Sequence, residues 1–171
     1  MTDSAPLPLS RPIEITSIRS DGSAFHVETS DAERAALAER FGIPGIASLT
    51  ADFLLRKKGP HVRVTGVVFG RFTQVCILTL EPFDTDFREE VEVAFDEDPA
   101  KALELRPEEE APDLIVGGII DVGALAGEFT ALALDPYPRK PGAVFEFTDK
   151  MDKGDEKPAP FGALASLRPP Q

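Results

Sequence analysis

The sequence predicts an α+β domain that combines a mainly antiparallel sheet with two principal helices and a mobile acidic loop. Apolar and polar side chains alternate through much of residues 48–95, which is the period of half-buried strands. Two other segments, 30–41 and 121–132, repeat apolar residues at helical spacing. The chain has 171 residues, 42% of them hydrophobic, which is enough for one domain with its own core. The sheet is either open or closed like a barrel.

The N-terminal part is expected to be a flexible segment followed by a β-hairpin. Residues 1–12 are rich in proline and small side chains, so the domain is predicted to begin at residue 13. Residues 13–18 then alternate apolar and polar side chains over most of their length, as a strand does. Asp21 and Gly22 favour a tight turn, so residues 24–28 can return as a second strand.

The first helix is predicted from both of its ends. Ser30 and Glu33 have the spacing of a capping box, in which each side chain accepts a hydrogen bond from the other residue's backbone N–H. Gly42 is placed to end the helix in the left-handed conformation. Leu37 and Phe41 lie one turn apart and are expected to share the buried face.

Residues 48–95 are expected to form antiparallel sheet. One face is predicted to be apolar, formed by Val62, Val64 and Val68, with His61, Arg63 and Thr65 on the other. Residues 81–84 supply a turn. A further strand alternates Phe87, Val91, Val93 and Phe95 with Arg88, Glu90 and Glu92.

Three segments complete the expected organisation. Residues 96–113 form the acidic loop, with at most a short helix near residues 100–105. Asp121 caps the second helix, and Pro136 follows its end. Residues 146–171 are a charged tail that ends in a short apolar motif. Residues 13–145 are therefore predicted to be a single domain.

Charge is concentrated in one segment of the chain. The formal net charge is −12, and residues 84–113 alone carry 13 acidic and 3 basic residues, a net of −10. The preceding residues 53–80 contain no acid. They contain five cations that form a candidate RNA-binding set: Arg56, Lys57, Lys58, Arg63 and Arg71. The alternative interpretation of these cations is the protection of an edge strand.

The acidic segment predicts the opposite kind of partner. Its candidate partner-binding residues are Glu89, Glu90, Glu108, Glu109 and Glu110. They can attract a basic protein, or they can simply keep the domain soluble. A chain this acidic is a poor candidate for nonspecific binding of nucleic acid, because phosphate contacts need clustered cations.

No catalytic, cofactor-binding or metal-binding residue is predicted. His26 and His61 lie in strand-like alternation, which is more typical of surface histidines than of a general base. Cys76 lies in an apolar strand context, which favours a buried, inert thiol. One cysteine and two distant histidines do not make a zinc site. Gly66 and Gly70 fit no phosphate loop and are expected at bulges or turns. The chain is predicted not to be an enzyme.

The location of the protein is predicted from three absences. No apolar run is long enough for a transmembrane helix, so membrane insertion is not expected. The N-terminus lacks the pattern of a signal peptide. A single cysteine excludes an internal disulfide and suits a reducing compartment. These features predict a cytoplasmic protein.

Three stretches, in this order, resemble the YceD family, the large ribosomal RNA subunit accumulation proteins. The first is residues 74–83, with Cys76 followed by Glu81, Pro82 and Phe83. The second runs from Asp121 to the pair Pro136 and Pro138. The third is residues 157–167, with the apolar side chains Phe161, Leu164 and Leu167. Many relatives have Cys-x-x-Cys in the first stretch, whereas this chain has Cys76 and Thr79, so a role that needs a cysteine pair is not carried over.

The resemblance implies a non-enzymatic factor for large-subunit ribosomal RNA accumulation and ribosome biogenesis. The expected partner is a ribosomal protein or a large-subunit rRNA precursor, and the acidic segment favours the protein. Phe161, Leu164 and Leu167 are expected to form a partner-binding motif in the tail. Relatives are often encoded near a ribosomal protein and a phospholipid-synthesis acyltransferase. A metabolic enzyme partner, or an accessory or enzymatic role in phospholipid or fatty-acid metabolism, is therefore the alternative.

Overall fold

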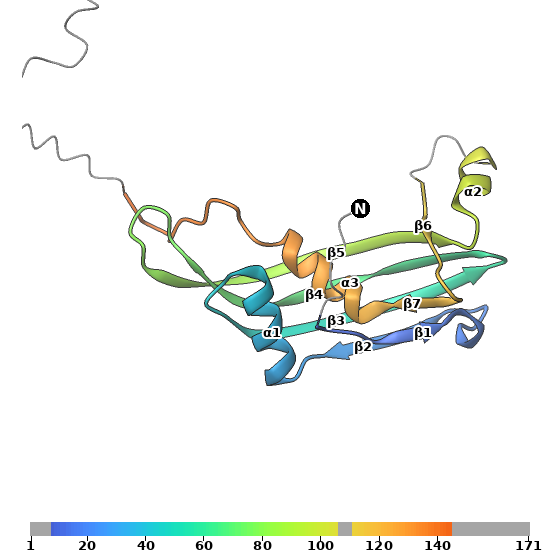
Figure 1. Ribbon diagram of the computed structural model, residues 1–171, viewed down its shortest axis with the longest axis horizontal. Helices are drawn as coiled ribbons and strands as arrows, with labels where there is room; N and C mark the ends of the chain where they lie inside the picture. Colours follow the sequence, from blue (N-terminus) through green and yellow to red (C-terminus); the bar gives the residue numbers. More distant parts are fainter. Residues whose placement is uncertain (1–7, 106–110, 145–171) are drawn as a thin grey trace, which may run out of the picture.

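The main sheet of the computed structural model has five strands, and residues 8–105 and 111–144 are described. The strands are β2 (Ser23–Glu28), β3 (Gly45–Lys58), β4 (His61–Val75), β5 (Pro82–Asp96) and β6 (Asp113–Leu114). They lie in the order β2-β3-β4-β5-β6, antiparallel except for the short parallel pair β5–β6 (Figure 1). The edge strands β2 and β6 do not pair, so the described chain contains no closed barrel. The α+β class with a mainly antiparallel sheet is confirmed.

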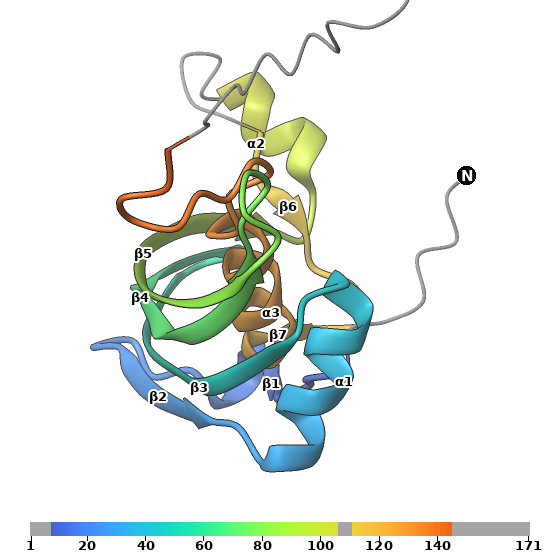
Figure 2. The same ribbon diagram turned by 90° about the vertical axis from the view of Figure 1, so that its left-hand side faces the viewer.

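Two long helices, α1 (Asp31–Phe41) and α3 (Val122–Leu132), pack against this sheet, as predicted. Figure 2 shows β3, β4 and β5 curving around α3, while α1 lies against β3. A second, small sheet pairs β1 (Pro12–Glu14) with β7 (Ile119–Asp121), and a 3-10 turn, Ile15–Ser17, follows β1. The face of the main sheet that holds α3 is called the concave face below, and the opposite face the convex face.

The ends of α1 follow the local sequence as predicted. The Ser30 side chain accepts from the Glu33 N–H, and the Glu33 carboxylate accepts from the Ser30 N–H at 2.9 Å. Gly42 ends the helix with φ of 67°. Leu37 is fully buried and Phe41 packs against the core beside it. Glu33 also binds the Arg11 guanidinium at 2.7 Å, which ties α1 to the chain before β1.

The concave face is the core of the domain. Val62, Val64 and Val68 are fully buried, which confirms the predicted face of β4. On the same face of β4, Gly66 and Gly70 let β3 come unusually close. A Cβ at Gly66 would lie 2.2 Å from the Asp52 carbonyl oxygen, so the curvature of the sheet requires glycine there. These glycines lie inside a strand and not in turns, although a bulge between Ile46 and Ser48 lies beside Gly70.

The predicted N-terminal hairpin is wrong. β1 pairs with β7 instead of β2, and β2 pairs with β3. The alternation of residues 13–18 is interrupted by the 3-10 turn, whose Ile15 is buried in the core. The chain is already attached before residue 13, because Leu9 is fully buried. Residues 8–12 are therefore part of the packed domain, which differs from the expected flexible segment.

The segments around β5 also differ from expectation. β5 begins at Pro82 and runs to Asp96, so the turn lies at residues 77–80 and not at 81–84. The start of the expected acidic loop 96–113 is ordered, since Asp96 is buried. The short helix expected there is present as α2 (Pro99–Leu105). Residues 106–110 and the tail 146–171 lie outside the described residues.

Candidate functional site

The turn between β4 and β5 is the best candidate site, because two stretches of the chain meet there. The Cys76 N–H donates to the Glu81 carbonyl at 2.9 Å, and the Leu80 N–H donates to the Cys76 carbonyl at 2.9 Å. Leu80 closes the turn with φ of 58°, in the left-handed region that non-glycine residues enter at a cost. This conformation holds Leu80 outward, with 77% of its surface exposed.

Cys76 lies one residue after β4, inside this turn. It is fully buried, as predicted, but it is not part of a strand. Hydrogen bonds from the Thr79 side chain, the Lys140 backbone and the backbone of Thr79 and Leu78 lower the pKa of the thiol to about 7, and burial opposes them. Thr79, which stands where many relatives of the resembled family have a second cysteine, is thus the main partner of the Cys76 sulfur.

The segment after α3 packs directly on this turn. The side-chain amide of Gln74, which is buried, donates to the Asp135 carbonyl at 2.9 Å. The Ile77 N–H donates to the Pro138 carbonyl at 2.9 Å. The structure therefore brings together the first two of the three stretches that resemble the YceD family. The third, with Phe161, Leu164 and Leu167, lies outside the described residues.

The other residues singled out in the first two stretches divide between this turn and the far end of α3. Glu81 forms an ion pair with Lys140 at 2.9 Å, Pro82 starts β5, and Phe83 is half-buried on the concave face. Pro136 and Pro138 line a hollow beside the turn. Asp121 caps α3 at its other end, so it is not part of this site.

Asp121 instead joins α3 to the N-terminal segment. Its carboxylate accepts from the backbone of Gly123 and Ala124, from the Arg11 N–H at 2.6 Å and from the Ser10 hydroxyl at 2.5 Å. Burial raises the pKa of Asp121, but these hydrogen bonds outweigh it and the pKa is lowered. The motif aspartate therefore has a structural role in the described chain.

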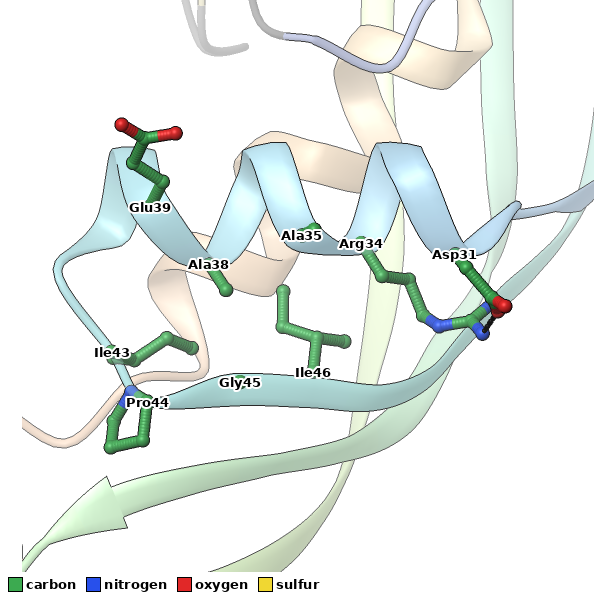
Figure 3. Close-up of a pocket in the computed structure, with 9 residues that line it drawn as sticks. All are labelled: Asp31, Arg34, Ala35, Ala38, Glu39, Ile43, Pro44, Gly45 and Ile46. Atoms are coloured by element: carbon green, nitrogen blue, oxygen red, sulfur yellow. Dashed lines mark hydrogen bonds and ion pairs between the residues drawn. The ribbon is translucent and has the colours of Figure 1, made fainter.

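Two adjoining hollows lie between α1, the loop that follows it and the β4–β5 turn. One, of about 500 Å³, lies between α1 and the start of β3, with Ile43 and Ile46 turned toward the helix and Glu39 pointing away (Figure 3). The second, of about 410 Å³, has a largely apolar lining: Phe41, Gly42, Ile43, Pro44, Gln74, Val75, Leu134, Asp135, Pro136 and Pro138. Ile43 and Pro44 separate the two hollows and border both.

Exposed apolar side chains surround the turn. Half of the large apolar side chains that are exposed in the described residues belong to the turn and the segment packed on it: Val75, Ile77, Leu80, Tyr137 and Val144. This set is called the turn surface below. Exposed apolar side chains that gather in one place are typical of protein-binding sites. This surface could not be predicted from the sequence, because the two segments that form it lie about sixty residues apart.

The five cations of the predicted RNA-binding set do not form one surface. Arg56, Lys58 and Arg63 lie on the convex face near one end, with Arg56 paired directly opposite Arg63. Lys57 points to the other face and donates to the Ile15 carbonyl. Arg71 also lies on the convex face, but eight residues beyond Arg63 along β4. Consecutive residues of a strand point to opposite faces, which is a signal the sequence did contain for Lys57.

Two of these cations are neutralised by β5. Arg63 binds Glu92 at 2.5 Å, and Arg71 binds both carboxylate oxygens of Asp86, at 2.6 and 2.8 Å. The Asp86 carboxylate raises the pKa of Arg71 and Arg71 lowers the pKa of Asp86. The basic stretch and the acidic stretch that follows it are thus, in part, the two sides of one hairpin.

The predicted acidic set is divided as well. Glu90 is exposed on the convex face, and Glu89 points to the concave face. Glu108, Glu109 and Glu110 lie outside the described residues. The histidines lie on the convex face, with His26 Nδ1 2.7 Å from Asp52 and His61 Nδ1 3.5 Å from Asp96.

Within residues 8–105 and 111–144, no group of three or more His, Cys, Asp and Glu side chains could hold a metal ion. None of the helices there combines the length and the apolar character needed to cross a membrane. Comparisons with family models, with curated proteins and with solved structures gave no match for this chain.

Proposed function

We propose that this protein is a non-enzymatic binding factor that supports large-subunit ribosomal RNA accumulation by holding a ribosomal protein. The observation that carries the proposal is a pair of hydrogen bonds, one between Gln74 and Asp135 and one between Ile77 and Pro138. They join two of the stretches that resemble the YceD family. Residues far apart in sequence thus support one exposed turn surface instead of separate parts of the core.

A protein partner is favoured over RNA by the charges on the convex face. Arg63 and Arg71 are already paired with carboxylates of β5. Phosphate groups that approach these cations also meet the carboxylates, which repel them. A basic ribosomal protein is attracted by the exposed carboxylates of the same face that make no ion pair in the described chain, such as Glu90. The apolar turn surface then provides the area that a protein contact needs.

Co-purification tests this proposal. The full chain, tagged and expressed in its own host, is expected to capture large-subunit ribosomal proteins at physiological salt, and deletion of its gene is expected to lower large-subunit relative to small-subunit rRNA. Capture of enzymes of lipid metabolism without ribosomal proteins would favour the metabolic role. Capture of rRNA that persists after ribosomal proteins are removed would favour direct RNA binding.

A matched pair of variants tests the turn surface. Leu80→Asn together with Tyr137→Ser removes two exposed apolar side chains, and asparagine tolerates the left-handed conformation of Leu80. We expect capture to fall at least tenfold, as for loss of a central aromatic contact. Val116→Ser is the control, because Val116 is equally exposed (72%) but belongs to the segment before β7, outside the turn surface. Equal loss from both variants would contradict the role of the turn.

A further inference from the structure

We infer that the outer edge of β5 is a docking edge for an extended segment of a partner protein rich in lysine or arginine, which adds to the sheet as one more strand. This inference rests on the proposed function and names the chemistry of the partner's contacting segment. Strand addition supplies affinity through backbone hydrogen bonds, and the side chains of the added strand supply specificity.

The first observation is an open backbone edge. β5 pairs with β4 along its whole length, but β6 covers only Phe95 and Asp96 on the other side. Among the described residues, no backbone hydrogen bond from another segment reaches residues 82–94 on that side. In the part of the chain that the structure describes, about thirteen residues of β5 therefore have no neighbouring strand on this edge, compared with the six residues of β2 at the opposite edge.

The register shows which backbone groups are available. In an antiparallel pair, residues that bond the neighbouring strand alternate with residues whose N–H and C=O point away from it. Glu81 accepts from Cys76 on the β4 side, whereas the Asp96 carbonyl accepts from Ile115 on the outer side. The odd-numbered residues of β5 therefore bond to β4, and the even-numbered ones direct their N–H and C=O groups outward.

The second observation is the charge of those outward residues. The even-numbered side chains from 84 to 92 lie together on the convex face and are exposed; Asp84, Asp86, Glu90 and Glu92 are acidic and Arg88 is basic. Asp86 and Glu92 are paired with Arg71 and Arg63 of β4, so Asp84 and Glu90 are the carboxylates without an ion pair in the described chain. Alternate side chains of an added strand lie directly beside them, within reach of opposite charges. Glu90 makes no ion pair or side-chain hydrogen bond within the described chain, so its carboxylate is free for a partner's cation.

The same charges disfavour a second copy as the occupant. Antiparallel pairing of two β5 edges centred on Arg88 places Asp84 opposite Glu92 and Asp86 opposite Glu90, and like charges directly opposite destabilise a strand pair. Charged edges discourage self-association in this way. A basic segment is the occupant that removes the repulsion, and extended basic segments are available in a protein that itself binds RNA.

The probe for the test is a 12-residue peptide of alternating lysine and threonine, with blocked ends, added to the full chain at physiological salt. At saturation, the outward amides of Asp84, Asp86, Arg88, Glu90 and Glu92 are expected to exchange with solvent at least tenfold more slowly in NMR measurements. The amides of β2 are expected to be unchanged. A peptide with glutamine in place of lysine, and one methylated on alternate backbone nitrogens, are expected to give no protection.

Variants separate charge from shape. Glu90→Gln is expected to weaken binding of the lysine peptide about two- to fivefold, the range for one exposed ion pair. Glu28→Gln is the matched control, because Glu28 is an exposed carboxylate of the same face on the opposite edge strand, and it is expected to leave binding unchanged.

Three results would overturn the inference. Binding of the lysine peptide without protection of the β5 amides would show a loose charge association only. Protection in the free protein that is lost on dilution would show a second copy at the edge. Full capture of ribosomal proteins by a protein whose β5 carboxylates are neutralised would place the contact elsewhere. If the peptide protects β5 but no ribosomal protein is captured, the proposed function fails and the docking edge stands.

Discussion

Replacement of Gly70 by alanine tests the reason for the curvature of the sheet. Gly70 lies on the concave face of β4, opposite Leu49 of β3. A Cβ there would lie 2.1 Å from the Ser48 carbonyl oxygen, where real Cβ atoms essentially never come within 3.0 Å. The obstacle is backbone, so no side-chain rotation relieves it. β3 and β4 must therefore separate locally.

The size of the effect follows from the hydrogen bonds that separation breaks. Loss of two ladder bonds in all, one on each side of Gly70, leaves buried backbone groups unsatisfied, at about 1–3 kcal/mol for each bond. Gly70→Ala is thus expected to lower the free energy of unfolding by about 2–6 kcal/mol, a large part of the 5–15 kcal/mol typical of a domain. Urea unfolding followed by circular dichroism measures it, with the midpoint falling by about 1 M or more.

Gly45→Ala is the control for this prediction. Gly45 also lies in a strand, but no atom lies within 4 Å of a Cβ placed there. Its substitution is expected to change the free energy of unfolding by less than about 1 kcal/mol. If Gly70→Ala and Gly45→Ala unfold at the same urea concentration as the original protein, close approach of β3 does not require glycine and the explanation of the curvature is wrong.

Three further predictions concern stability and the tail. Cys76→Ala is expected to remain folded and to complement a deletion. The pKa of the thiol in the folded protein, about 7, lies below its ordinary value of 9.0, so the stability that the thiolate adds is present at high pH and lost as the pH falls through 7. The urea midpoints of Cys76→Ala and the original protein are therefore expected to differ more at pH 9 than at pH 6. Glu33→Gln is expected to make the free energy of unfolding less dependent on pH in acid. Hydrogen bonds, chiefly from Arg11, lower the pKa of Glu33 from 4.5 to about 2, so its stabilising effect is present above pH 4.5 and lost as the pH falls toward 2. Removal of residues 158–171, which lie outside the described residues, is expected to leave unfolding cooperative and to weaken capture of the partner.

Each of these has a contrary outcome. Stoichiometric zinc in the purified protein, or a folded Cys76→Ala protein that fails to complement, would show that the thiol does more than pack. An unchanged acid midpoint in Glu33→Gln would show that protonation of Glu33 does not contribute to acid unfolding. Loss of cooperative unfolding on truncation would place the tail in the core and remove the motive for a partner-binding role.

The sequence alone determined the elements whose signals are local. The boundaries of α1 were predictable because Ser30, Glu33 and Gly42 act within one turn of the helix. The buried face of β4 was predictable because alternation fixes which side chains share a face, and Val62, Val64 and Val68 are buried as expected. The burial of Cys76 followed from its apolar neighbours in the same way.

Only the tertiary structure decided which distant segments meet. Pairing of β1 with β7 depends on some hundred intervening residues, whereas the tight turn at Gly22 predicted a local hairpin. The sequence predicted separate binding surfaces for the acidic and the basic stretch. The register of β4 and β5 instead places Arg63 beside Glu92 and Arg71 beside Asp86, and both form ion pairs within the sheet. The turn surface and the open edge of β5 exist for the same physical reason: exposure and hydrogen bonding depend on which neighbour a strand or turn receives, and that neighbour is set by packing of the whole chain.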